Sequence, residues 1–132
     1  MKKNGNHPSH KGQAFTEFAI VIPIMVLMFL AIITFSAGFI AYANAANAAN
    51  YGARRGSVAQ ENAIGMAMAA AQSKANQLGG GSFSAIAYGG GGRGAQIIVE
   101  VHWETQNLLS TIGIGPAIIS GTATSAFRQE GW

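Results

Sequence analysis

The sequence predicts an α+β fold: a long N-terminal transmembrane helix that continues into an exported segment, a second helix, and a small antiparallel sheet of about three strands. The prediction rests on an uncharged run of 26 residues from Phe18 to Ala43, an alanine-rich segment after it, and alternating apolar and polar residues near the C-terminus. We expect a basic cytoplasmic leader at 1–12, the membrane helix and its extension at 13–56, and an exported α+β domain at 57–132.

The uncharged run is long enough to span a membrane. As a helix it would measure roughly 39 Å, against a hydrocarbon core of about 30 Å. Its only polar side chains are Thr34, Ser36 and Tyr42. Pro23 removes one backbone donor, but spanning helices tolerate proline, so we expect the helix to continue through it.

The distribution of charge predicts how the chain crosses the membrane. Lys2, Lys3 and Lys11 precede the apolar run, whereas Arg54 and Arg55 follow it. This bias favours an N-terminus in the cytoplasm, so the chain is expected to be a single-pass protein of the inner membrane with an exported C-terminal domain. The net charge of +3 comes from the leader, and no nucleic-acid partner is expected.

The segment after the membrane run repeats asparagine every third residue. Asn44, Asn47 and Asn50 would lie on one slowly drifting helix face, with alanines around them. Small residues permit close helix packing, although a solvated alanine-rich extension fits the same pattern. Gly52 and Gly56 are expected to loosen the helix here.

A second helix is expected to begin at Ser57. Ser57 and Gln60 match the Ser-x-x-Gln pattern of a capping box, and three glycines at 79–81 would end the helix. Apolar residues at alternating spacings of four and three form a stripe that we expect to face the core: Ile64, Met68, Ala71, Ala75 and Leu78.

Three strands are expected after this helix, at 82–88, 95–104 and 117–127. A glycine-rich connection separates the first two, and a loop or short helical turn at 107–115 precedes the third. The second strand alternates, with one face expected to be buried and formed by Ile97, Val99, Val101 and Trp103.

No constellation in the chain favours catalysis or a cofactor. The glycine-rich segment 89–94 contains Arg93, but a strand follows it and no Gly-Lys-Ser/Thr does, so a hairpin connection is favoured over a phosphate site. Glu100, His102 and Glu104 could share a metal, yet the outer face of any half-solvated strand shows such residues. Without cysteine or aspartate, neither thiolate chemistry nor a Ser-His-Asp triad is available. We predict no cofactor, no metal site and no enzymatic activity.

Gly12 and Glu17 lie at the start of the apolar run. A carboxylate there is costly unless a cation reaches it. A newly freed amino terminus on an adjacent subunit would supply that cation.

The run from Lys11 to Pro23, KGQAFTEFAIVIP, resembles the processing region of TadE-like minor pseudopilins of the Tad/Flp branch of type IV pili. Asn47 to Arg54 resembles the stretch that follows the membrane helix in this family, and the chain ends in strands closing on Arg128 and Glu130. The resemblance implies cleavage by a prepilin peptidase after Gly12.

The resemblance also implies roles for the residues around that bond. Gln13 would become the mature N-terminus, Glu17 would serve processing or subunit register, and Phe18 favours a minor pseudopilin because major Flp pilins usually carry tyrosine there. The implied function is a structural or assembly component of a Tad pilus used in adhesion or secretion, with possible incorporation in the pilus. The implied partners are the membrane, other pilins and pseudopilins, Tad assembly proteins and the prepilin peptidase.

Two other interpretations remain open. Signal peptidase could release a secreted binding protein after Ala43, because Ala41 and Ala43 form an Ala-x-Ala site, but 26 apolar residues exceed a signal core of about 7–15. Alternatively, an uncleaved anchor could carry an extracytoplasmic binding domain, which would make Gly12 and Glu17 incidental.

Overall fold

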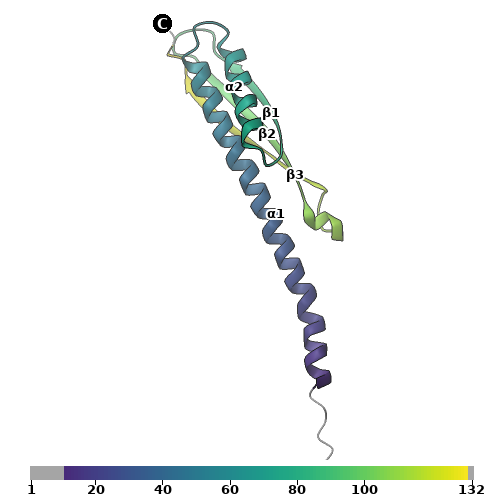
Figure 1. Cartoon of the computed structure of the whole chain (residues 1–132). Helices are drawn as coiled ribbons and strands as arrows, with labels where there is room; N and C mark the ends of the chain where they lie inside the picture. Colours follow the sequence, from purple (N-terminus) through teal and green to yellow (C-terminus); the bar gives the residue numbers. More distant parts are fainter. Residues whose placement is uncertain (1–10, 131–132) are drawn as a thin grey trace, which may run out of the picture.

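The chain forms one long helix with a small α+β domain packed on its C-terminal half (Figure 1). The computed structural model describes residues 11–130, so most of the predicted leader lies outside the described residues. The predicted fold class is confirmed, with the elements α1 (Lys11–Ser57), α2 (Ala63–Leu78), β1 (Ser82–Gly89), β2 (Gln96–Gln106), the 3-10 helix η1 (Leu108–Ile112) and β3 (Ile118–Arg128).

Helix α1 is the longest element and runs without interruption for 47 residues. At 1.5 Å per residue it measures roughly 70 Å, more than twice the thickness of a hydrocarbon core. It starts at Lys11, two residues before the expected position, and passes through Pro23 as a helix. Within the part of the chain that the structure describes, it is the one helix long and apolar enough to cross a membrane.

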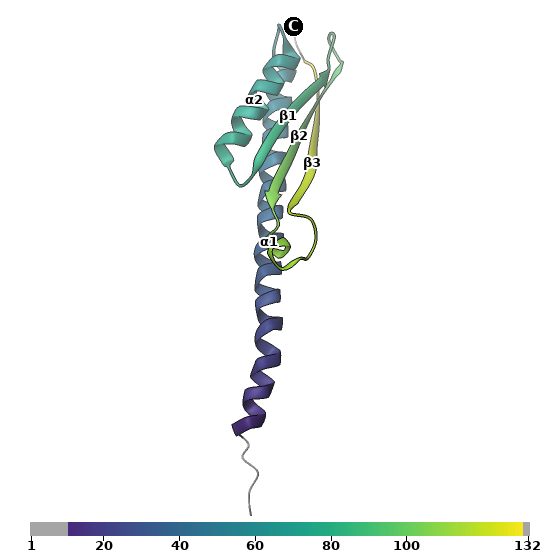
Figure 2. The ribbon, with the colours of Figure 1, turned by 90° about the vertical axis from the view of Figure 1, so that its right-hand side faces the viewer.

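The sheet is antiparallel throughout, in the order β1-β2-β3. β2 lies at its centre, with Trp103 opposite Phe83 on one side and Gly121 on the other. Helices α1 and α2 cover one face of the sheet (Figure 2). The four inward residues of β2 are buried as predicted: Ile97, Val99, Val101 and Trp103.

Gly52 and Gly56 do not loosen α1, contrary to expectation, because the helix continues past both. They lie where α1 meets α2. A Cβ built on Gly52 would lie 2.6 Å from the carbonyl oxygen of Ala67, and one on Gly56 would lie 2.9 Å from that of Ala63. The glycines therefore permit close approach of two helices and do not act as hinges.

The predicted capping box at Ser57 is wrong. Ser57 is the last residue of α1, and its hydroxyl donates to the carbonyl oxygen of Arg54 at 2.9 Å. α2 begins at Ala63 after Asn62, which has a left-handed backbone (φ 48°) and whose side chain accepts a hydrogen bond from Gly65 N. Asparagine tolerates this conformation better than most residues, so Asn62 and not Ser57 caps the helix.

The predicted apolar stripe of α2 is confirmed at Ala71 and Ala75 and is wrong at Ile64, Met68 and Leu78. The buried residues are Ala67, Ala71 and Ala75, whereas Ile64 and Met68 are exposed. Close approach to α1 leaves room for methyl groups alone at the contact, and the larger apolar side chains lie beside it. Side-chain size, and not hydrophobicity, decides which face of α2 is buried.

Candidate functional site

The predicted processing residues lie together on the first turns of α1. Gly12, Gln13, Glu17 and Phe18 are all helical and exposed. Gln13 and Glu17 are one turn apart, and Gln13 Nε2 donates to Glu17 Oε1 at 3.4 Å. The structure thus places the glycine, the carboxylate and the start of the apolar surface on one continuous segment.

The Gly12–Gln13 peptide lies in the first turn of this helix. The first N–H groups of a helix have no partner within it, so this turn opens at little cost. Thr16 Oγ1 donates to the carbonyl oxygen of Gly12 at 3.0 Å. A Cβ built on Gly12 would meet no atom within 4 Å, so the surroundings of this bond leave it open to another protein.

Glu17 is an exposed carboxylate among exposed apolar side chains. Phe15 and Phe18 are 80% and 68% exposed. Among the side chains that the structure describes, none forms an ion pair with Glu17. A carboxylate in hydrocarbon costs up to about 3 kcal/mol at the bilayer centre, so Glu17 favours the membrane boundary or a cationic partner from another molecule.

The second part of the candidate site is the small-residue surface of α1, where the domain packs. It consists of residues without exposure, Ala41, Ala45, Ala48, Ala49 and Ala53. Sequence reasoning left close packing and a solvated extension equally open here. The structure favours packing, because these alanines belong to the same core as Ile97, Val99 and Val101.

The asparagine repeat supplies polar links at the edges of this surface. Asn44 Nδ2 donates to the carbonyl oxygen of Gly79 at 3.0 Å, which ties the end of α2 to α1. Ser125 Oγ in β3 donates to Asn50 Oδ1 at 2.6 Å. Asn47 is exposed. Two of the three repeated asparagines therefore fasten the domain to α1.

A basic cluster lies where α1 meets α2 and was missed by sequence reasoning. Arg55 and Lys74 both lie near the ring of Tyr51, with 5.4 and 5.9 Å from cation to ring centroid. Arg55 Nε also donates to Tyr51 Oη at 3.2 Å. Lys74 comes from α2, so no signal in the local sequence could have joined it to α1.

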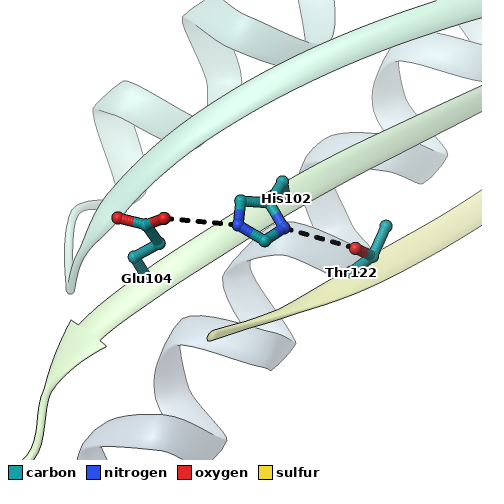
Figure 3. A network of polar contacts seen from close by, with 3 residues as sticks. All are labelled: His102, Glu104 and Thr122. Carbon is teal, nitrogen blue, oxygen red and sulfur yellow. Dashed lines mark hydrogen bonds and ion pairs between the residues drawn. The ribbon is translucent and has the colours of Figure 1, made fainter. Parts of the chain in front are cut away.

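The outer face of the sheet carries the three residues weighed as metal ligands. His102 lies between Glu104 and Thr122, with 3.4 Å to an oxygen of each (Figure 3). Glu100 instead accepts a hydrogen bond from Tyr88 Oη, which raises the pKa of Tyr88. Among the described residues, no three histidine or acidic side chains are placed to share a metal.

The glycine-rich segment after β1 is the expected hairpin connection. Gly89 pairs with Ile97, and Gly90 N donates to the carbonyl oxygen of Gln96 at 2.9 Å. Arg128 Nε donates to the carbonyl oxygen of Gly94 at 3.2 Å and so fastens the segment to the end of β3. This geometry closes a hairpin. Asn62 and Ala63 at the start of α2 line a hollow together with Gly90, Gly91 and Gly92, but no Gly-Lys-Ser/Thr follows the glycines.

Comparison with known protein families gives a match that covers most of α1. Residues 12–54 match the family described as TadE-like protein, which confirms the suspected relation. The match begins at Gly12, ends at Arg54 and lies entirely within α1. No curated protein and no solved structure matches the chain.

Proposed function

We propose that this chain, whose residues 12–54 match the TadE-like family, is a minor pseudopilin that acts as a structural or assembly component of a Tad pilus used in adhesion or secretion. One observation carries the proposal. The family match coincides with α1 and includes the exposed Glu17 at the first turns of its apolar surface. The role is mechanical and needs no catalytic group.

The proposed topology follows from charge and length. The N-terminus with its lysines lies in the cytoplasm, α1 crosses the inner membrane once, and residues 57–132 face the exported side. The exposed apolar side chains of α1 support this arrangement, because in water they would be unfavourable, whereas lipid or neighbouring pilin helices can cover them.

Processing is proposed after Gly12 by a prepilin peptidase, so that Gln13 becomes the mature N-terminus. Glu17 then lies one turn from the new amino group. In an assembly with other pilins or pseudopilins, Glu17 of one subunit would accept the amino terminus of its neighbour. Phe18 continues the apolar surface directly after this carboxylate.

The secreted alternative is disfavoured by where its cleavage would fall. Cutting after Ala43 would divide α1 between Ala41 and Ala45, two core residues without exposure. The released product would lose the side chain of Ala41 from its core and begin inside a helix that packs against the sheet.

The first test is the N-terminal residue of the protein recovered from native membranes, by intact mass or terminal sequencing. A start at Gln13 supports the proposal. A start at Asn44 would mean a secreted product, and an intact Met1 would mean an uncleaved anchor; either result contradicts processing after Gly12.

The second test is substitution of Glu17. We expect Glu17→Ala and Glu17→Gln to lose processing or assembly, because both remove the charge, although glutamine keeps the size of the side chain. Ser36→Ala is the control, since it removes one exposed hydroxyl from α1 well away from the Gly12–Gln13 bond. Normal processing and normal piliation in both Glu17 variants would refute the assigned role.

A further inference from the structure

The segment between β2 and β3 is apolar and exposed. We call residues 107–118 the η1 loop. The 23 residues between Glu104 and Arg128 carry no charge and no histidine. Four large apolar side chains of the η1 loop are between 36% and 52% exposed: Leu108, Ile112, Ile114 and Ile118. In water, such a gathering at one end of a small domain is unusual and marks a contact surface.

The η1 loop lies beside the membrane-length part of α1. It projects below the sheet along α1 in Figure 2, and η1 contacts α1. The first fully buried residue along α1 is Thr34, which is 16 residues after Phe18, or about 24 Å along the helix. A hydrocarbon core of about 30 Å that begins near Phe18 would end near Ala37. The domain therefore reaches down to the depth of the membrane boundary.

The backbone of the η1 loop is suited to an apolar environment because several of its polar groups are paired internally. Buried Asn107 organises it: Nδ2 donates to the carbonyl oxygens of Ile114 (3.2 Å) and Pro116 (2.7 Å), and Oδ1 accepts from Leu109 N at 3.0 Å. Asn107 N donates to the carbonyl oxygen of Ala117 at 2.9 Å. Paired backbone groups greatly reduce the cost of leaving water.

We propose that the η1 loop contacts lipid, with its apolar side chains immersed in the leaflet where α1 leaves the membrane. The inference rests on the membrane insertion of α1 in the proposed function, but not on its direction. Lipid is favoured over a protein partner because η1 contacts α1, and the end of the proposed span is itself apolar, with Phe35 and Phe39 73% and 71% exposed. Its lack of charge fits the acyl region of a bilayer.

Single-cysteine labelling tests this directly, because the native chain has no cysteine. Ile112→Cys and Ile114→Cys report on the η1 loop, Met28→Cys on the middle of the proposed span, and Ala126→Cys on the outer face of the sheet. Each full-length variant carries an environment-sensitive fluorophore in phosphatidylcholine–phosphatidylglycerol vesicles. Nitroxide lipids with a shallow or a deep spin label then serve as quenchers in both leaflets.

We expect labels at 112 and 114 to be blue-shifted and quenched more by the shallow nitroxide. The label at 28 is expected to be quenched more by the deep one, and the label at 126 by neither. Loop labels that behave like the label at 126, while 28 is quenched, would overturn this inference alone. Blue-shifted loop labels without lipid quenching would also overturn it, because a second protein copy would then cover the loop. No quenching at 28 would overturn the membrane insertion itself and with it the proposed function.

Discussion

The two halves of α1 have opposite surfaces although they form one helix. In the lower half, residues 12–40, large apolar side chains are exposed, among them Phe18, Met28 and Phe35. In the upper half, residues 41–57, small side chains such as Ala45 and Ala53 are fully buried. The lower half is suited to lipid, where large apolar groups need no protein cover, and the upper half to close contact with protein. The change from large to small apolar side chains along α1 thus marks where a surface suited to lipid gives way to a surface suited to protein contact.

The largest expected effect comes from placing a charge in the lower half. Met28→Arg puts a guanidinium near the centre of the proposed span and should disfavour insertion by about 3 kcal/mol. The measurement is the fraction of protein recovered in carbonate-washed membranes. Asn47→Arg is the control, because Asn47 is exposed in the upper half. Equal membrane recovery of both variants would remove the distinction between the halves.

The second effect comes from enlarging a small residue in the upper half. Gly52→Val places a Cβ 2.6 Å from backbone and side-chain atoms of α2, so overpacking should lower the free energy of unfolding by about 2–3 kcal/mol. Gly38→Val is the matched control, since a Cβ there meets nothing within 4 Å. Denaturant unfolding in detergent compares the two. A smaller loss at 52 than at 38 would contradict the close contact.

A weaker effect is expected from the polar link between α1 and β3. Asn50→Ala removes the acceptor for Ser125 and should destabilise the domain by about 0.5–1 kcal/mol. Ser125→Ala and the double variant complete a mutant cycle, and Asn47→Ala serves as the exposed control. Additive effects of the two substitutions would show that this bond does not couple the helix to the sheet.

The smallest effect is expected on the outer face of the sheet, which touches neither half of α1. The hydrogen bond to Glu100 raises the pKa of Tyr88, so the neutral phenol is favoured in the folded state. Its contribution to stability is present below the ordinary tyrosine pKa of about 10 and is lost as pH rises through the folded value. The unfolding midpoints of wild type and Tyr88→Phe should therefore differ at pH 7 and converge at high pH. A difference that grows with pH would contradict the assignment.

Much of the fold could be predicted from periodicity. The membrane-length helix follows from an uncharged run, and the alternation around Val99 and Val101 fixed the buried face of β2. The failures all concern α2 and its junction with α1. There, Ser57 fits a capping box but remains in α1, and Met68 lies outside the core because Gly52 brings the two helices too close. Such contacts depend on which segments meet, which local patterns do not contain.

In the candidate site, too, features set by local sequence could be predicted, and contacts between distant segments could not. Gly12 and Glu17 could be found from sequence, because spacing along one helix is local information, and their proposed roles await the tests above. The cluster around Tyr51 could not be found, because Lys74 reaches it from another helix. The η1 loop was expected as a loop or short helical turn, and the structure forms a 3-10 helix there. Its position beside α1 could not be predicted, because that position depends on how the whole sheet packs on the helix.

The uninterrupted course of α1 has a mechanical consequence. The last residue of the helix is joined to the far end of the sheet, where Glu130 N donates to the carbonyl oxygen of Ser57 at 3.0 Å, and alanines hold the domain along the upper half. Helix α1 therefore acts as one rigid rod, and the α+β domain keeps a fixed orientation relative to it. Under the proposed topology, a partner that rotates or lifts α1 within the membrane would rotate or lift the exported α+β domain by the same amount.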